Sequence, residues 1–479
     1  MNRSNQSTFN FRRQQLVENW TQIRLSKEFK FILLLSAVHL PLGILFFRIG
    51  SVSLLHPLGV FLLGVYWALQ QNVRLERITL VCAYIIGAEV LWRMADVPVN
   101  WEFGKYSVCV IMVLALVRRG LFSIPFLPAA YLLLLIPACL LVIANYYPEF
   151  AQISISFNMS GPLLLSISCW FFHKTRFRQP EIKRVIVMAL IPLLSVAFTT
   201  LFLTLANPNI EFTLESNDAT SGGFGPNQVS SMLGLGAFLA VGMIMLFRNS
   251  SKEKIFYGFA ATFLAAQSVM TFSRGGIYSA AGAILVLFIF QVKDPQTFIK
   301  KAIPVIVLAL LFAFWIFPLL DQYTGGMLEQ RFESTETTHR VDIIQSDFQM
   351  LAENPVFGVG VGVARGYREK FVDFSSASHT EFSRLIAEHG IFGIAAIFSL
   401  LLMIVLNLKR QRPGFGRALA AGLITWSSLF MFNAGMRLAA PSFLWGVSFA
   451  AIAGVQILSR RKSKSLIRKK HRSMKPQTV

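Results

Sequence analysis

Runs of about twenty consecutive apolar residues recur along this 479-residue chain and limit its fold more than any other feature. The runs lie at roughly 29–47, 52–69, 78–94, 104–117, 122–145, 152–172, 185–205, 226–247, 254–272, 275–292, 302–320, 389–407, 417–434 and 441–458. A helix of that length spans the hydrocarbon core of a bilayer. Only 14% of the residues are charged, against roughly 25% in a typical soluble domain. We therefore expect an all-α polytopic integral membrane protein with about fourteen (12–14) transmembrane helices.

The placement of the basic residues predicts the topology. Of the 45 lysines and arginines, 34 lie in the two tails and in every second connection between the apolar runs. Because basic connections remain in the cytoplasm, we expect both termini there and the other connections outside it. The net charge of +21 then reflects topology and contact with lipid headgroups, so nucleic acid is not an expected partner.

This topology divides the chain into five parts. We expect a basic cytoplasmic tail over 1–28, a helix bundle over 29–320, an extracytoplasmic catalytic loop over 321–388, C-terminal transmembrane helices over 389–458 and a second basic tail over 459–479. A long polar segment in a chain of this kind is more often functional than a plain connector. The functional site is therefore expected on the extracytoplasmic side.

Two short motifs precede the long loop on the same predicted side. In SGGFGPNQVSS at 221–231, Pro226 suits the first position of a helix, whose N-terminus attracts anions. Gly225, Asn227 and Gln228 are candidates to support a bound anion, and a plain loop-to-helix junction is the alternative. In TFSRGG at 271–276, Arg274 lies between two apolar runs, where an arginine either serves a function or extends to the membrane surface.

Within the long loop, a helical pattern of apolar residues begins after Arg340. Apolar residues at helical spacing, Val341, Ile344, Phe348 and Leu351, predict an amphipathic helix over 340–352 that ends before Pro355. The helix is expected to lie on the membrane surface or to cap the bundle. Arg340 either turns toward a phosphate or is an ordinary surface arginine.

A glycine-rich stretch, VFGVGVGVARG, follows this helix. It lacks the strand and the spacing of a dinucleotide-binding motif. Gly358, Gly360 and Gly362 are instead expected to allow close approach of the backbone to a ligand or to another helix.

The stretch SSASHTEFSRLIAEHGIFG supplies the candidate base. Ser376 or Ser378 is expected to cap a helix that begins near His379, carries Glu388 and breaks at Gly390. An imidazole with an ordinary pKa near 6.5 makes His379 the best candidate for a general base, and a structural histidine is the alternative.

Two other histidines, His389 and His339, are rivals for the role of base. The sequence contains no H-E-x-x-H motif, C-x-x-C pair or carboxylate cluster typical of a metal centre, so no metal or other cofactor is expected.

Together these motifs resemble the signature region of the bacterial O-antigen ligase and polymerase family. The resemblance rests on Arg340 followed by NPVFGVGVG and SHTEFSRLIAEHGIFG, and on the upstream SRGG and GGFGPNQ. It covers roughly residues 215 to 410 of this chain.

The resemblance implies a metal-independent, inverting membrane glycosyltransferase with a GT-C-like fold. Its donor would be a glycan linked to undecaprenyl diphosphate, and its active face would be the periplasmic or extracellular side of the bacterial inner membrane. Arg274 and Arg340 match the family's diphosphate-binding arginines, and His379 matches its catalytic histidine. Gly360 and Glu388 join the three residues at 225–228 as further candidates at the donor site.

The acceptor remains open. A growing lipid-linked glycan would make the protein a polymerase in O-antigen or exopolysaccharide biosynthesis, and lipid A core would make it a ligase. Polymerisation is favoured because no feature specific to a lipid A core acceptor is identified, and other polysaccharide assembly proteins are candidate partners. A transporter or flippase is the alternative of another class, but it predicts charges along a path through the membrane centre.

Overall fold

The computed structural model describes residues 26–453 except 217, 292–294, 335–338 and 375. Almost all of its regular structure is helical. Two three-residue strands, β1 (Arg176–Arg178) and β2 (Ala451–Ala453), pair in parallel. Within the described residues nine helices are long and apolar enough to cross a membrane. The expected all-α polytopic membrane fold is confirmed.

The helices follow the apolar runs closely. The first half of the chain forms α2 (Lys27–Arg48), α3 (Gly50–Leu69), α4 (Leu75–Met94), α5 (Phe103–Arg118), α6 (Phe126–Leu134), α7 (Ile136–Asn145), α8 (Pro148–Phe172) and α9 (Gln179–Ala206). The second half forms α10 (Pro226–Leu246), α11 (Ser251–Met270), α12 (Gly275–Gln291), α13 (Pro295–Leu311), α14 (Phe317–Tyr323), α15 (Met327–Glu333), α16 (Arg340–Glu353), α17 (Ala364–Tyr367), α18 (Glu381–Arg410), α19 (Phe415–Ala434) and α20 (Ala439–Val447). A π-helical turn, Phe312–Ile316, joins α13 to α14, and 3-10 turns lie at Ala219–Ser221 and Arg368–Lys370.

Two expected spans differ from the structure. The run at 122–145 is interrupted at Leu135, where α6 ends and α7 begins, because Pro137 removes a backbone donor and favours a new helix start. The expected helix at 441–458 is wrong after Val447, where α20 ends before β2. Residues 454–458 of that run lie outside the described part of the chain.

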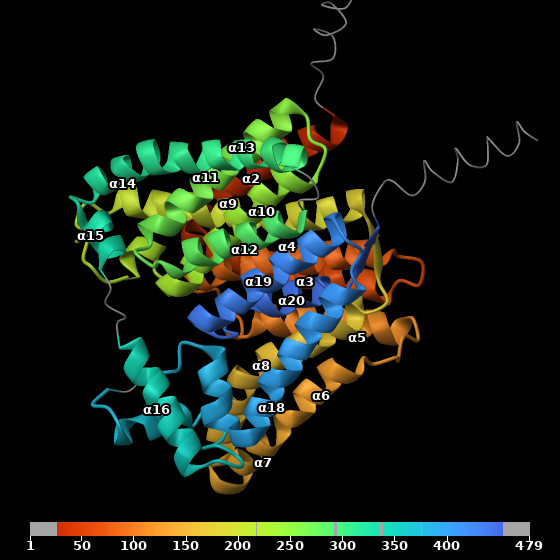
Figure 1. Cartoon of the computed structure of the whole chain (residues 1–479), viewed down its shortest axis with the longest axis vertical. Helices are drawn as coiled ribbons and strands as arrows, with labels where there is room; N and C mark the ends of the chain where they lie inside the picture. Colours follow the sequence, from red (N-terminus) through yellow and green to blue (C-terminus); the bar gives the residue numbers. More distant parts are fainter. Residues whose placement is uncertain (1–25, 217, 292–294, 335–338, 375, 454–479) are drawn as a thin grey trace, which may run out of the picture.

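Small residues allow α12 to pack closely in the bundle. A Cβ on Gly276 would lie 2.1 Å from the carbonyl oxygen of Ser230 in α10, and one on Gly275 would lie 2.0 Å from the amide nitrogen of Asn433 in α19. The start of α12 is thereby fixed between α10 and α19. By contrast, the segment Phe298–Tyr323 buries none of its apolar window. Figure 1 shows α13 and α14 along the upper edge of the bundle. Several of the large apolar side chains in this segment are exposed, among them Phe314, Trp315 and Leu319.

Helix α18 contains the break that the sequence predicts at Gly390. Its φ of 59° and ψ of −135° are not helical, and a Cβ there would lie 2.6 Å from the carbonyl oxygens of Pro355 and Val356. The backbone N–H of Ile391 donates to the carbonyl of Pro355 at 2.9 Å. The break therefore receives the loop that follows α16.

Helix α16 begins at Arg340 and ends before Pro355, as expected. Its predicted apolar stripe faces outward, since Val341 is 48% and Phe348 is 55% exposed. The opposite face carries the buried Ile343, Asp347 and Met350, together with Ser346. Figure 1 shows α16 set apart below α15 on the left of the view.

Candidate active site

Three arginines converge on one cavity, which we call the arginine pocket. It has a volume of about 330 Å³ and is lined by Asn227, Ser273, Arg274, Gly275, Tyr278, Ser279, Arg331, Arg340, Leu429, Phe432 and Asn433. These residues come from α10, the turn before α12, α12 itself, α15, α16 and α19. The pocket therefore joins elements that are far apart in the sequence.

The short turn between α11 and α12 places Arg274. Its first residue, Thr271, accepts a hydrogen bond at Oγ1 from the N–H of Ser273, and the Ser273 hydroxyl donates to Asn227 Oδ1 at 2.7 Å. The Arg274 guanidinium donates to the backbone carbonyl of Ser334. Close packing at the two following glycines keeps this turn at the end of the bundle.

The other two arginines reach the pocket from the long loop. Arg340, the first residue of α16, donates from Nη1 to Asn433 Oδ1 at 2.8 Å and from Nη2 to Asn227 Oδ1 at 3.5 Å. Arg331 in α15 donates from Nε to the carbonyl of Phe272 at 3.1 Å. Burial, together with the charges of Arg274 and Arg331, lowers the pKa of Arg340 below its usual range. The pocket thus concentrates positive charge, which a bound anion would partly neutralise.

His379 lies in the segment that leads into α18. The side chain is half-buried, and within the described residues its Nδ1 is buried without a hydrogen-bond partner. Burial, together with the charges of Arg340, Arg437 and Arg368, lowers the pKa of His379 to about 4. The imidazole is therefore neutral near pH 7 and able to accept a proton.

A buried ion pair fixes the segment that carries His379. Arg368 contacts Asp347 in α16 and also donates to the Ser378 hydroxyl at 2.8 Å. Ser378 donates to the same carboxylate at 3.1 Å, and Ser383 in α18 donates to it at 2.6 Å. Although its charged partners lower the pKa of Asp347, burial outweighs them and raises it above its usual range. These contacts tie α16 and α18 to the residue preceding His379.

The start of α18 differs from the expected one. The helix begins at Glu381, and its cap is Thr380, whose hydroxyl accepts from the N–H of Phe382 at 3.3 Å. The expected caps, Ser376 and Ser378, are therefore wrong. Arg368 holds both residues in the segment before the helix, since it donates to the carbonyl of Ser376 and to the hydroxyl of Ser378. His379 consequently precedes the helix and is not part of it.

The rival histidines lie in different environments. His389 is 0% exposed inside α18. His339 has a φ of 58° before α16, and its exposed ring contacts Asp342 at 3.3 Å. Like His379, neither lines the arginine pocket.

The glycine-rich stretch contacts another helix, one of its two expected roles. Gly358, Gly360 and Gly362 have φ values of 67°, 98° and 76°. The N–H of Val359 donates to the carbonyl of Ala387 at 3.0 Å, and that of Gly360 donates to the carbonyl of Glu388 at 3.1 Å. These bonds attach the loop to α18 just before its break.

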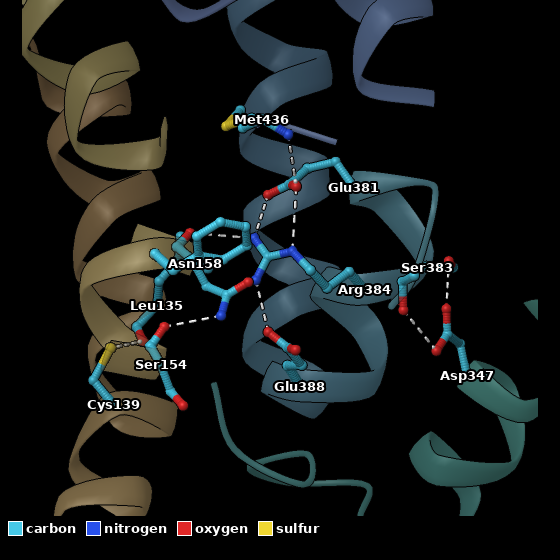
Figure 2. A network of polar contacts seen from close by, with 12 residues as sticks. Leu135, Cys139, Ser154, Asn158, Asp347, Glu381, Ser383, Arg384, Glu388 and Met436 are labelled. Carbon is cyan, nitrogen blue, oxygen red and sulfur yellow. Dashed lines mark hydrogen bonds and ion pairs between the residues drawn. The ribbon is translucent and has the colours of Figure 1, made fainter. Parts of the chain in front are cut away.

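A second cavity, of about 410 Å³, lies between α8 and α18, and we call it the α8–α18 cavity. Arg384, one of its lining residues, forms ion pairs with Glu381 and with Glu388, the latter at 2.6 Å (Figure 2). Glu381 also accepts from the N–H of Met436 at 3.2 Å. The carbonyl of Met436 accepts from Lys105 Nζ at 3.0 Å. Buried charges on both sides therefore hold the turn after α19.

The structure groups only part of the candidate residues. Arg274, Arg340 and Asn227 meet in the arginine pocket. Glu388 lines the α8–α18 cavity instead, and Gly360 packs against α7 and α18. Gly225 and Gln228 start α10 but line neither cavity.

Sequence reasoning missed several residues of the two cavities. Arg331, Asn433 and Arg437 belong to no recognisable motif, and Arg384 lies in the SHTEFSRLIAEHGIFG stretch without having been singled out. The signal available for Asp347 was its position four residues after Ile343 and three before Met350, on the buried face of α16.

The fold and site define a polytopic membrane protein with an anion-attracting pocket and a neutral histidine at one end of its bundle. Residues 259–398 match the model of a family described as O-antigen ligase. The match confirms the resemblance for this part of the chain and contains Arg274, Arg331, Arg340 and His379, whereas the motif at 222–228 lies outside it. No curated protein matches the chain. The match supports a membrane function of the O-antigen ligase or polymerase type.

The described residues contain no group of three or more His, Cys, Asp or Glu side chains placed to hold a metal ion. The acidic side chains of the α8–α18 cavity are instead engaged by Arg384.

Proposed function

We propose that the protein is an inverting membrane glycosyltransferase whose donor is a glycan linked to undecaprenyl diphosphate. The observation that carries the proposal is the pocket of three arginines, one of which, Arg340, also acts on the neutral His379. Guanidinium groups suit phosphate oxygens because they donate paired, charge-assisted hydrogen bonds. Arg274, Arg331 and Arg340 would hold the diphosphate, with Asn227 and Asn433 orienting Arg340.

In the proposed reaction the acceptor hydroxyl attacks the anomeric carbon of the donor. The new carbon–oxygen bond forms as the bond to the diphosphate breaks, and the diphosphate leaves with the electron pair. His379 takes the hydroxyl proton, an effect typically worth about 10² to 10⁴ in rate. The arginines stabilise the negative charge that develops on the leaving group. Direct displacement inverts the anomeric centre, and no metal is required.

The apolar rim of the arginine pocket supports a lipid-linked donor. Tyr278 in α12 is 56% exposed and Phe432 in α19 is 58% exposed, and both line the pocket. An exposed apolar rim on a membrane-embedded helix faces lipid without cost. The prenyl chain would lie along this rim with its diphosphate among the arginines.

We place this activity on the extracytoplasmic face of a bacterial inner membrane, with both termini in the cytoplasm. The basic connections at 70–77, 118–119, 173–184, 248–254 and 409–417 alternate with those that carry the site. We favour polymerisation onto a lipid-linked glycan, with transfer to lipid A core as the alternative. Other polysaccharide assembly proteins are proposed partners.

The test measures glycan transfer by the purified protein in lipid. The protein is given an undecaprenyl-diphosphate-linked oligosaccharide, and a metal chelator is present. We expect products of laddered length from the native chain and from His339→Ala, whose ring is exposed and outside both cavities. We expect none from His379→Ala. A single added glycan on lipid A core would indicate a ligase. Absence of transfer by the native chain to either acceptor would overturn the proposal in favour of transport.

A further inference from the structure

The α8–α18 cavity and the arginine pocket are lined by consecutive parts of the chain at the end of α19. Asn433, in the last turn of α19, lines the arginine pocket, whereas Gly435, Met436 and Arg437 after it line the α8–α18 cavity. Arg437 donates to the carbonyl of Ser378, the residue before His379, at 3.4 Å. The two cavities are therefore neighbours at this end of α19.

His379 is adjacent in the chain to the α8–α18 cavity, because Ser378, the residue before it, lines that cavity. Arg340 from the arginine pocket and Arg437 from the α8–α18 cavity both lower the pKa of its imidazole. A base beside the cavity could accept the proton of a hydroxyl offered from it.

The side chains of the α8–α18 cavity suit the end of a glycan. Asn158 offers a side-chain amide, and Phe157 offers an aromatic side chain and is 38% exposed. The lining carries three arginines, Arg365, Arg384 and Arg437, against the two glutamates that pair with Arg384, so its formal net charge is +1. The volume of about 410 Å³ lies in the range of small-ligand sites.

Both cavities take most of their lining from residues 259–398, which match the O-antigen ligase family, but they differ in what the rest of the chain adds. Outside the match, the arginine pocket receives Asn227 and three residues of α19. One wall of the α8–α18 cavity comes from α8, with Ser154, Phe157 and Asn158, and another comes from 435–437. Figure 2 shows Ser154 and Asn158 facing α18 across from Arg384. An acceptor particular to this protein would contact the α8 wall, which lies outside the match.

We propose that the α8–α18 cavity binds the terminal sugars of the acceptor glycan and that Phe157 and Asn158 help to select it. The proposal rests on the proposed function, since it assigns the second substrate of the same reaction. The acceptor hydroxyl would pass from this cavity toward His379, lose its proton there and form the glycosidic bond as the diphosphate departs.

A matched pair of substitutions on α8 tests the proposal through kinetics. Phe157 lines the cavity and Phe150 does not, although the two are similarly exposed at 38% and 40%. We expect Phe157→Ala to raise the acceptor KM by about fivefold or more with the donor KM unchanged, and Arg437→Gln to act in the same direction. Phe150→Ala should change neither constant. An unchanged acceptor KM in Phe157→Ala and Arg437→Gln, or a change in the donor KM alone, would overturn the assignment.

A second measurement separates this inference from the proposed function. Hydrogen exchange of the His379→Ala protein, which should not turn over, is followed with acceptor oligosaccharide alone and with undecaprenyl-diphosphate-linked donor alone. We expect the acceptor to protect amides at 153–158 and 435–437, and the donor to protect those at 271–279. If the native chain transfers glycan but the acceptor protects only 271–279, the cavity assignment fails while the proposed function stands. If the native chain transfers nothing yet the acceptor protects 153–158, the proposed function fails and the glycan site stands.

Discussion

Arg368 and Asp347 form an ion pair in which both side chains are 0% exposed. The pair connects the 3-10 turn after α17 to α16 and also holds Ser378, next to His379. A buried charge is costly without its partner, so the pair fixes these elements in one arrangement. The position of the proposed base therefore depends on charges that do not touch substrate.

Removing one charge of this pair should damage both stability and transfer. We expect Arg368→Gln to lower the free energy of unfolding by about 3–5 kcal/mol, because it leaves the Asp347 carboxylate buried without its partner. Thermal unfolding in detergent measures the loss. The double variant Arg368→Gln/Asp347→Asn should recover much of the stability.

The exposed pair of His339 and Asp342 is the control for this substitution. Asp342→Asn should change the unfolding temperature little, because exposed pairs contribute about 0–1 kcal/mol. Equal unfolding temperatures for Arg368→Gln and Asp342→Asn would contradict the assigned role of the buried pair.

Gly390→Ala should unfold the junction between α18 and the loop after α16. The alanine would adopt a φ of 59° and place its Cβ 2.6 Å from two carbonyl oxygens, at a cost of order 1–3 kcal/mol for the backbone alone. Increased proteolysis within 355–362 and loss of transfer would report the damage. Gly366→Ala is the control, since no atom lies within 4 Å of its added Cβ. Native-like proteolysis of Gly390→Ala would show that the break is not required.

Asn433→Asp should weaken donor binding without unfolding the bundle. The substitution places a carboxylate about 2.8 Å from Arg340 Nη1 and introduces negative charge where the diphosphate is proposed to bind. Repulsion of this kind is expected to cost about tenfold or more in affinity. Equilibrium binding of labelled undecaprenyl-diphosphate-linked glycan measures the change, with the exposed Asn145→Asp as control. An unchanged affinity of Asn433→Asp for the donor would contradict the proposed position of the diphosphate in this pocket.

The pH dependence of transfer should reflect the low pKa of His379. The imidazole accepts a proton only when neutral, so the rate is lost as the pH falls through its pKa of about 4. We expect kcat/KM for the donor, which reports the free enzyme, to be flat above about pH 5 and to fall near pH 4. A bound diphosphate stabilises the imidazolium, so kcat should fall at a higher pH. A free-enzyme profile with its midpoint near 6.5 would contradict the burial of His379.

The sequence predicted those parts of the fold that local rules govern. Apolar runs marked the helices, Pro226 marked the start of α10, and Pro355 marked the end of α16. The proposed site residues Arg274, Arg340 and His379 were recognisable as candidates because each lies in a short motif on the predicted extracytoplasmic side.

Other features depend on packing between distant segments. Arg331 and Asn433 reach the arginine pocket only after α15 and α19 have folded against it, and no local pattern distinguishes them. Arg368 and Asp347 resemble surface charges in the sequence, because nothing local shows that they are buried together. The outward direction of the apolar stripe on α16 likewise depends on Asp347 occupying the opposite face.

The central claim is that His379 acts in the chemical step and the arginine pocket acts in donor binding. It is tested most directly by single-turnover transfer and equilibrium donor binding measured on the same preparations of native protein, His379→Ala and Arg340→Gln. We predict that His379→Ala binds donor within about twofold of native and transfers at least about 100-fold more slowly, whereas Arg340→Gln binds donor weakly. Transfer by His379→Ala at the native rate, with donor bound normally, would contradict the account.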